Sequence, residues 1–233
     1  MKAVILAGGQ GTRLKSVIHD IPKPMAPVQG RPFLEFLVSR LIGEGVCTII
    51  LSVGYLHKQI MDHFGDGSNL HATIEYCIEH EPLGTGGGVR EALRMADSDD
   101  VLVMNGDTFA AVDVKNVVKH HKQLGAVMTM VAIPVVDASR YGTVNISSEG
   151  LVTAFAEKKR SDVALINSGV YIVNKKLLDI IPAGTVSLEL DVLPELAEKG
   201  LLAAQIQDVP FIDIGVPSDY HEFCQNSSKY TGF

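Results

Sequence analysis

Residues 3–14, with the sequence AVILAGGQGTRL, join a short apolar run to a glycine-rich loop. The run 3–6 is apolar throughout, which is typical of a buried strand in a parallel sheet. The loop that follows has glycine at three of four positions, so its backbone N–H groups can crowd together and face an anion. Arg13 adds a forked cation that suits phosphate oxygens. The stretch therefore predicts the first strand of an α/β sheet, ending in a phosphate-binding loop.

This loop differs from two other phosphate-binding loops. Lys15-Ser16 is preceded by Leu14, where a Walker A loop has glycine, and Leu14 also takes the third glycine position of a dinucleotide loop. A tight turn that needs glycine for its own geometry is the alternative interpretation. Thr12 and Arg13 favour the phosphate loop over that turn.

The order of predicted elements indicates the fold class. Strands and helices alternate through the first half, which favours an α/β domain with a mostly parallel sheet. After Pro134, short alternating runs predict an antiparallel ribbon beside that sheet. We expect residues 226–233 to fray, and the pair His120-His121 to lie on the surface. Strands are predicted at 3–6, 48–53, 73–78, 101–104 and 127–133, in the ribbon at 143–147, 151–156 and 169–173, and at 203–206. Helices are predicted at 33–42, 56–64, 88–96, 113–124, 175–181, 188–199 and 218–225.

Length and charge exclude several classes of protein. The chain has 233 residues, 46% of them hydrophobic, and its 27 acidic and 20 basic side chains give a net charge of −7. These values are typical of a globular domain and disfavour nucleic-acid binding, which requires a basic surface. The longest apolar stretch, 127–136, is broken by Thr129 and Pro134 and is far shorter than the about 20 residues of a membrane span. We expect a soluble, cytoplasmic protein that binds neither nucleic acid nor membrane.

Acidic residues follow the predicted strand 73–78, at the sheet edge where parallel α/β proteins bind ligands. Glu79 and Glu81 could accept hydrogen bonds from the N1–H and amino groups of guanine. The glycine-rich backbone at 84–88 would let a flat ring or a ribose approach closely. The alternative is a helix N-terminus with flexible glycines, beside a solvated Glu79.

Three charged residues suggest a site for phosphate and metal. Asp107 follows the wholly apolar strand 101–104, and Asp213 lies between apolar neighbours late in the chain. Mg²⁺ in proteins is commonly held by one or two carboxylates plus substrate phosphates, so this pair predicts a nucleotide–Mg²⁺ site. Taken alone, Asp107 would more often cap the next helix. Lys23 lies between two prolines, which makes it rigid enough to point at one phosphate, although an ordinary proline-rich loop is the alternative.

The predicted ribbon supplies further polar groups in apolar surroundings. They could line a sugar pocket, in which one lysine would meet a second phosphate and a neighbouring glutamate a sugar hydroxyl. Each of them alone is more often a surface residue than a ligand contact. The residues are Tyr141-Gly142, Glu157-Lys158 and Asn167-Ser168-Gly169.

Together these motifs resemble those of the sugar-1-phosphate nucleotidyltransferases, also called nucleotide-sugar pyrophosphorylases. The resemblance implies the nucleotide-diphospho-sugar transferase fold, a Rossmann-like α/β sandwich whose mixed, mostly parallel sheet carries an antiparallel ribbon. It also implies a single catalytic domain over 1–233, without the C-terminal β-helix or other domain that many relatives carry. The motifs occur in the family's order: LAGGxGTRL at 6–14, PKPM at 22–25, EPLGT at 81–85, NGD at 105–107, FxEK at 155–158, NxG at 167–169 and DIGxPxDY at 213–220.

The resemblance also implies a reaction, the Mg²⁺-dependent transfer of a nucleoside monophosphate from a triphosphate to a sugar 1-phosphate, with pyrophosphate leaving by direct displacement. Within the family, the segments at 15–27, 32–36, 81–87 and 140–145 are most similar to those of the D-glycero-α-D-manno-heptose 1-phosphate guanylyltransferases. This favours GTP, and GDP-heptose made for capsule, S-layer or lipopolysaccharide glycans. Mannose-1-phosphate guanylyltransferases, and uridylyl- or thymidylyltransferases acting on another hexose 1-phosphate, are the alternatives. A homodimer is common in such enzymes.

The resemblance assigns a role to each matching residue. Arg13, Lys23 and Asp107 are expected to be catalytic, and Asp107 and Asp213 to hold Mg²⁺. The sugar 1-phosphate is expected to contact Tyr141, Gly142, Glu157, Lys158, Asn167 and Gly169. The nucleotide is expected to contact Leu6, Ala7, Gly8, Gly9, Gly11, Thr12, Arg13, Glu79, Glu81, Pro82, Gly84, Thr85, Asn105 and Gly106.

Two other classes of protein fit less well. A GT-A glycosyltransferase would need an acidic D-x-D motif at a strand tip, and the local candidate, Asp97-Ser98-Asp99, precedes its strand. A non-catalytic nucleotide-sugar sensor would be expected to have lost Arg13 or Lys23, and both are present.

Overall fold

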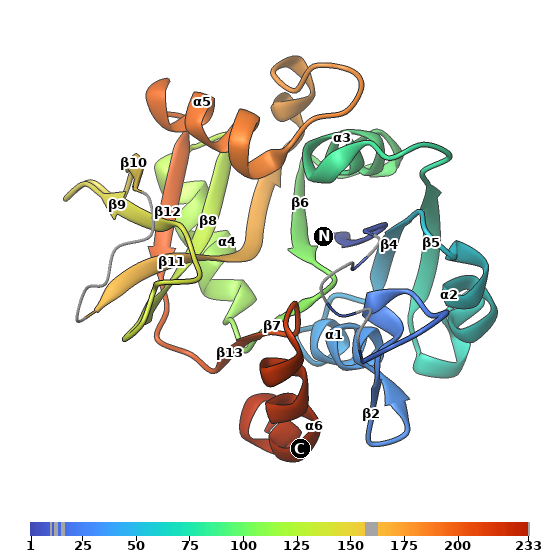
Figure 1. Cartoon of the computed structure of the whole chain (residues 1–233). Helices are drawn as coiled ribbons and strands as arrows, with labels where there is room; N and C mark the ends of the chain where they lie inside the picture. The colour runs from blue at the N-terminus through green and yellow to red at the C-terminus, as the bar shows by residue number, and fades with distance from the viewer. Residues whose placement is uncertain (10, 12–13, 15–16, 157–162, 233) are drawn as a thin grey trace.

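The computed structural model describes residues 1–9, 11, 14, 17–156 and 163–232. Its centre is a nine-stranded mixed sheet, with helices on both faces (Figure 1). The predicted fold class is confirmed. Among the described residues, no helix has both the length and the apolar composition needed to cross a membrane.

One half of the sheet is parallel. Its order is β6 (Asp100–Asn105), β1 (Ala3–Ala7), β4 (Thr48–Val53) and β5 (Thr73–Ile78). Neighbouring strands in this half run in the same direction. Strands β4 and β5 have the predicted bounds, because short apolar runs between polar turns define such strands well. The four strands therefore end at one edge of the sheet.

The other half is antiparallel and is continuous with the first. Strand β11 (Ala164–Asn174) pairs antiparallel with β6 and also with β8 (Met128–Val135). Strand β12 (Leu202–Ile206) extends this half beyond β8, whereas β9 (Thr143–Ile146) and β10 (Val152–Ala156) form a hairpin against the start of β11. The predicted ribbon therefore joins the main sheet through β11, and does not merely lie beside it.

Two layers of helices cover the sheet, because side chains alternate between its faces along each strand. Ile5 of β1 packs into a core with α1, α2, α4 and α6, and Val4 packs into a second core with α3 and α5. The helices are α1 (Phe33–Gly43), α2 (His57–Phe64), α3 (Gly84–Met95), α4 (Val114–Leu124), α5 (Leu193–Glu198) and α6 (Pro217–Thr231). The short turns of helix are η2 (Lys23–Met25), η3 (Ser68–Leu70), η4 (Lys175–Asp179) and the π-helical η5 (Leu188–Val192).

Two small sheets lie outside the main one. Strand β7 (Thr108–Ala110) pairs antiparallel with β13 (Phe211–Asp213), and β2 (Pro27–Val28) pairs with β3 (Arg31–Pro32). The sequence did not predict these strands, because two or three residues are too few to establish a period. The β7–β13 pair is important for the site, since it joins two segments that are about 100 residues apart.

The C-terminal helix α6 is longer than predicted. It continues to Thr231, with a kink at Asn226, where the expected fraying would begin. The added turn is held by contacts along α6 and by the packing of Tyr230 into the core. Tyr230 is buried and packs against Phe223, and the Thr231 hydroxyl donates to the Ser227 carbonyl at 3.1 Å.

Helix α4 corrects the expectation for the histidine pair. Asp113 caps this helix as its sequence suggests, by accepting from the Asn116 backbone N–H. His121, however, is buried, and its Nδ1 lies 2.8 Å from the Thr129 hydroxyl on β8. Because α4 packs its apolar stripe on β8, β11 and β12, the histidine at the edge of that stripe is covered.

Candidate active site

The carboxyl ends of β1, β4, β5 and β6 meet at a cavity of about 670 Å³. We call this region the glycine-loop side of the site; it consists of the residues that follow these four strands. It contains most of the predicted nucleotide-binding residues within the described part of the chain. These are Leu6, Ala7, Gly8, Gly9, Gly11, Glu79, Glu81, Pro82, Gly84, Thr85 and Asn105, and the predicted catalytic residues Lys23 and Asp107 line the same cavity. Thr12 and Arg13 lie outside the described residues.

Close backbone contacts shape the glycine-loop side. Gly106 is not among the described lining residues; it donates its N–H to the Leu6 carbonyl at 2.9 Å. A Cβ at Gly106 would lie 2.6 Å from that carbonyl oxygen. A Cβ at Gly84, whose φ is +71°, would lie 2.4 Å from the Val186 carbonyl oxygen. Glycine is therefore required at both positions by sterics, whatever is bound.

Glu79 is held in one orientation at the end of β5. Its Oε1 accepts from the Ser52 hydroxyl at 2.7 Å, and Ser52 is fully buried on β4. A carboxylate has about four lone-pair positions, so Glu79 can accept further hydrogen bonds. Glu81, by contrast, is exposed at the edge of the same cavity. Of the two predicted guanine acceptors, Glu79 is the more rigidly placed.

Thr85 links this side of the site to a distant segment. Its hydroxyl donates to Glu189 Oε2 at 2.7 Å and accepts from the Leu188 N–H at 2.8 Å. The Val186 carbonyl accepts from the N–H groups of Gly86 and of the following glycine, at 2.8 and 3.3 Å. The first turn of α3 is thus capped by residues 186–189, and the Thr85 hydroxyl proton is already used within the protein.

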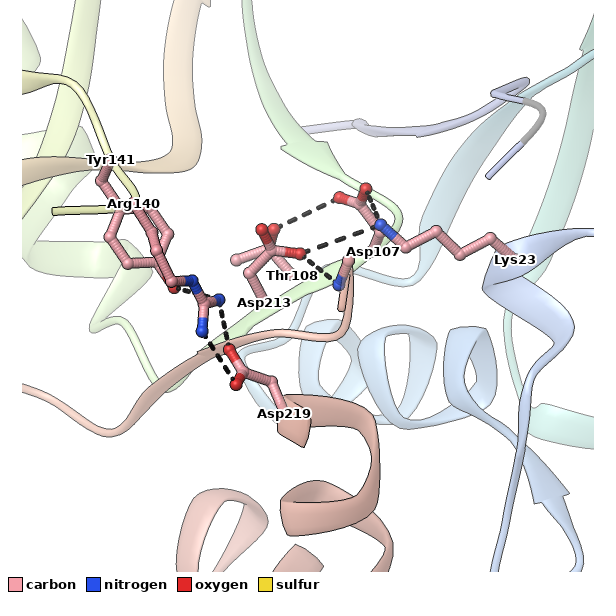
Figure 2. Close-up of polar contacts among 8 residues, drawn as sticks. Lys23, Asp107, Thr108, Arg140, Tyr141, Asp213 and Asp219 are labelled. Atoms are coloured by element: carbon pink, nitrogen blue, oxygen red, sulfur yellow. Dashed lines mark hydrogen bonds and ion pairs between the residues drawn. The ribbon is translucent and has the colours of Figure 1, made fainter. Parts of the chain in front are cut away.

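The predicted metal ligands lie side by side. Pairing of β7 with β13 places Asp213 opposite Thr108, so the carboxylates of Asp107 and Asp213 face a common space. Lys23 Nζ donates to Asp107 Oδ2 at 2.7 Å and lies 3.8 Å from Asp213 Oδ1. The Gly215 N–H donates to Asp213 Oδ1 at 2.6 Å. Figure 2 shows Lys23 reaching both carboxylates from one side, with Arg140 and Tyr141 on the other side.

These residues fit a magnesium ion. Two carboxylates and one ammonium leave a net charge of −1, and hard oxygen donors are the ligands that Mg²⁺ prefers. Asn105 Oδ1 is buried and has no hydrogen-bond partner among the described residues, so another unused oxygen belongs to the residue two positions before Asp107. The described residues contain no cluster of three or more metal-ligating side chains. Asp107 and Asp213 would therefore share the ion with oxygens of a bound phosphate or with water.

Tyr141, one of the residues predicted to contact the sugar 1-phosphate, lies on the other side of the carboxylates (Figure 2). We call this region the ribbon side; it consists of residues 138–145 and 164–171. The Tyr141 ring packs edge-on against Phe211 of β13 with a centroid distance of 5.8 Å, and burial raises the pKa of Tyr141. Gly142 is exposed. Within the described part of the chain, neither of them lines the 670 Å³ cavity. Glu157 and Lys158 lie outside the described residues.

The start of β11 completes the ribbon side. Asn167 Nδ2 donates to the hydroxyl of the fully buried Tyr171 at 2.6 Å, and its Oδ1 accepts from the Gly169 N–H at 3.0 Å. Gly169 lies so close to Asn105 that a Cβ at Gly169 would come within 2.6 Å of Asn105 Nδ2. Asn167 and Gly169 also lie outside the lining of the cavity as far as the structure describes it. They connect the ribbon side to the carboxyl end of β6.

The sequence analysis missed several residues of the cavity. Gly54, Tyr55 and His57 follow β4 and line the cavity. The Tyr55 N–H donates to the Gly8 carbonyl at 3.3 Å. The strand-end rule that identified the other loops would also have identified these residues if it had been applied to the strand at 48–53. Pro24, His80 and Gly215 also line the cavity, next to residues that were predicted.

Comparison with known proteins identifies the family. Residues 2–229 match the family model described as nucleotidyl transferase. The chain belongs to the nucleotidyl transferase family. This confirms the resemblance inferred from the motifs, and it agrees with a cavity at the ends of parallel strands beside two carboxylates.

Similar members of the nucleotidyl transferase family are aligned over nearly their whole length. The D-glycero-alpha-D-manno-heptose 1-phosphate guanylyltransferase of Campylobacter jejuni is 41% identical over 97% of this chain and 100% of its own. The protein of the same name from Aneurinibacillus thermoaerophilus is 39% identical over 99% of this chain and 100% of its own. The crystal structure of HddC from Yersinia pseudotuberculosis complexed with GMP-PN is 39% identical, with a TM-score of 0.87 over 97% of this chain and 99% of that one.

Proposed function

We propose that this protein is a guanylyltransferase that joins GTP and D-glycero-α-D-manno-heptose 1-phosphate into GDP-heptose and pyrophosphate. The observation that carries the proposal is the full-length similarity, at 41% and 39% identity, to two relatives of that name. A similar solved structure complexed with GMP-PN supports a guanine nucleotide. The geometry supports a reaction on phosphates, because glycine loops, a buried lysine and paired carboxylates meet at one cavity. The product would be the donor for a glycosyl-transfer reaction, such as the synthesis of a surface glycan.

The reaction is a single displacement at phosphorus. An oxygen of the sugar 1-phosphate forms a bond to the α-phosphorus of GTP, the bond from that phosphorus to the bridging oxygen breaks, and pyrophosphate leaves with the electron pair. No group of the protein needs to become covalently attached. Catalysis of this kind consists mostly of positioning and charge neutralisation.

The described residues can be assigned parts of this task. Backbone N–H groups of the loop after β1 would face the triphosphate. Lys23, whose side chain is 8% exposed, would present its charge to the phosphates from a fixed position. Glu79, fixed by Ser52, would accept hydrogen bonds from guanine. Asp107 and Asp213 would hold Mg²⁺, which when bound neutralises phosphate charge. Arg13 and Lys158 are assigned to pyrophosphate and to the sugar phosphate by their motifs alone.

A matrix of substrates tests the proposal. Pyrophosphate release is measured with GTP, ATP, UTP, CTP and dTTP against heptose, mannose, glucose and N-acetylated sugar 1-phosphates. GTP with heptose 1-phosphate is expected to give the highest kcat/KM. The highest value for UTP with glucose 1-phosphate would contradict the proposal. A glycosyltransferase or a sensor would release no pyrophosphate with any pair.

Metal removal tests the assignment of the two carboxylates. EDTA is expected to stop pyrophosphate release, and an excess of Mg²⁺ to restore it. Asp107→Asn should weaken Mg²⁺ binding by the apo protein in calorimetry, whereas Asp179→Asn, at an exposed position on η4, should leave it unchanged. Equal Mg²⁺ affinity in wild type and Asp107→Asn would contradict the assignment.

A further inference from the structure

An ion pair joins the ribbon side of the site to the C-terminal helix. Arg140 precedes Tyr141 in the segment between β8 and β9, and Asp219 lies in the first turn of α6. Arg140 Nη1 donates to Asp219 Oδ1 at 3.0 Å, and Nη2 donates to Oδ2 at 2.5 Å (Figure 2). Each terminal nitrogen therefore donates to one oxygen of the carboxylate. This is the bidentate geometry that makes arginine–carboxylate pairs strong. The Arg140 side chain is 43% exposed and that of Asp219 is 20% exposed, so the carboxylate is the better shielded partner of the pair.

The same arginine also fixes its neighbour. The Arg140 guanidinium lies over the Tyr141 ring, 5.4 Å from its centroid, and the other edge of that ring packs against Phe211. Phe211 is two residues before Asp213 on β13, the strand that brings the paired carboxylates together. A continuous set of contacts thus runs from Asp219 through Arg140 and Tyr141 to the carboxylates.

The charge of Arg140 is already used by this pair. The hydrogen bond to Asp219 is the main cause that raises the pKa of Arg140 above its ordinary value. With both terminal nitrogens on the Asp219 carboxylate, and Nη2 also 3.3 Å from the Tyr141 hydroxyl, the two-pronged fork of the guanidinium is occupied within the protein. An arginine that binds phosphate directly needs those nitrogens free.

We propose that Arg140 and Asp219 are positioning residues, which hold Tyr141 and the ribbon side at the correct distance from the Asp107/Asp213 carboxylates for the sugar 1-phosphate. The inference rests on the proposed function. It assigns the pair to the sugar half of the reaction, because its contacts are with the ribbon side. Within the described residues, neither Arg140 nor Asp219 lines the cavity of the glycine-loop side. A pair that aligns one substrate should change the KM of that substrate and not the KM of the other.

Kinetics of four variants test this inference. Arg140→Ala and Asp219→Ala are each expected to raise the KM for the sugar 1-phosphate about tenfold or more, and to leave the KM for GTP within about twofold. The exchanged pair Arg140→Asp with Asp219→Arg should recover most of the lost affinity, since it re-forms the bridge in the opposite sense. Lys199→Ala, which breaks an exposed ion pair with Glu195 on α5, is the control and should change neither KM.

Three results would overturn the inference. If only Arg140→Ala raised the KM for the sugar, Arg140 would contact the phosphate directly. If both KM values rose together, the pair would serve general stability. If the exchanged pair bound the sugar no better than the single variants, the bridge would not be the cause. Should an alanine variant fail to fold, Asp219→Asn, which keeps the shape, replaces it.

The test uses whichever sugar 1-phosphate the wild-type protein converts best in the substrate matrix. A different best sugar would contradict the proposed substrate and leave this test intact. The expected pattern, a selective change for the sugar and recovery in the exchanged pair, would still decide the role of Arg140 and Asp219.

Discussion

The two sides of the site differ in how they are held: close contacts between backbone segments shape the loops of the glycine-loop side, whereas an ion pair from a distant helix supports the ribbon side. On the glycine-loop side, Gly84 and Gly106 lie so close to carbonyl groups that any side chain would clash. On the ribbon side, Arg140 is held by Asp219, and Asn167 by a buried tyrosine. Gly142, also on this side, has no described heavy atom within 4 Å of a Cβ.

This difference affects how each side could change. A backbone cradle accepts a common group, such as a phosphate chain, and tolerates almost no substitution. A side built from side-chain pairs can alter its shape by exchanging a few residues. The backbone of the glycine-loop side therefore suits a phosphate chain, which all nucleoside triphosphates share. The ribbon side suits the part of the substrates that varies.

The largest expected effect is at the junction of the two sides. Asp107→Asn should lower kcat by about 10²–10³-fold, because it weakens the hold on the Mg²⁺ that would neutralise phosphate charge in the transition state. The Asp107 carboxylate also accepts from the buried Lys23, but Asn keeps an acceptor oxygen and Asp213 Oδ1 lies 3.8 Å from the same ammonium, so the melting temperature should change little. Pyrophosphate release and thermal unfolding provide the two measurements.

This result would also sharpen the comparison between the sides. Since Asp107 lies between them, the two KM values should change by similar small factors. A selective rise in one KM would place Asp107 with that substrate alone. Near-normal turnover in Asp107→Asn would contradict its catalytic role, and Asp179→Asn is the exposed control.

A pair of glycine substitutions compares the two sides directly. Gly106→Ala should lower the free energy of unfolding by about 1–3 kcal/mol, because its Cβ would lie 2.6 Å from the Leu6 carbonyl oxygen. Gly142→Ala should change it by less than about 0.5 kcal/mol, because the space around it is open. Chemical denaturation of both variants measures the difference. Equal losses of stability would break the comparison.

A smaller effect is expected where a side chain supports the backbone cradle. Glu189→Ala removes the acceptor of the Thr85 hydroxyl. Thr85 lies in the first turn of α3, and its hydroxyl also accepts from the Leu188 N–H. The KM for GTP should rise about 5- to 10-fold, as expected for the loss of one hydrogen bond worth about 1 kcal/mol, and the KM for the sugar should not. Steady-state kinetics with each substrate varied in turn provides the measurement.

Two further variants act as controls for Glu189. Glu189→Gln keeps an acceptor oxygen for Thr85 and should restore most of the affinity for GTP. Leu190→Ser changes the adjacent side chain, which is 80% exposed, and should have no effect. If Gln and Ala behaved alike, the charge of Glu189 and not its hydrogen bond would be the important feature.

The smallest expected effect is on the pH dependence of stability, at His121 of α4, which lies beside Thr129 of β8. Burial is the main cause that lowers the pKa of His121 below its ordinary value of 6.5, although the nearby Asp100 opposes it. The folded protein therefore prefers neutral His121. As the pH falls below about 6.5, the unfolded chain binds a proton that the folded chain resists, so stability decreases. We expect His121 to contribute about 1 kcal/mol or less to the loss of unfolding free energy between about pH 7 and 5.

Denaturation at several pH values tests this contribution. His121→Gln, which cannot titrate, should reduce the slope of stability against pH. An unchanged slope in His121→Gln would mean that the network joining His121 to Thr129 on β8 does not depend on the neutral ring.

The sequence by itself determined the family, the α/β class and most residues of the glycine-loop side. These follow from local patterns: apolar runs of fixed length define β1, β4, β5 and β6, and ligands bind where parallel strands end.

Only the tertiary structure decided how the ribbon side is held. The Arg140–Asp219 pair spans 79 residues, and the β7–β13 pairing that joins Asp107 to Asp213 involves strands of three residues. Neither leaves a period or a local motif in the sequence. The burial of His121 and the extent of α6 to Thr231 were likewise not predicted from the sequence, since both depend on elements that are distant in the chain. Contacts of this kind form between segments that are far apart in the chain, and local propensity does not determine which distant segments pack together.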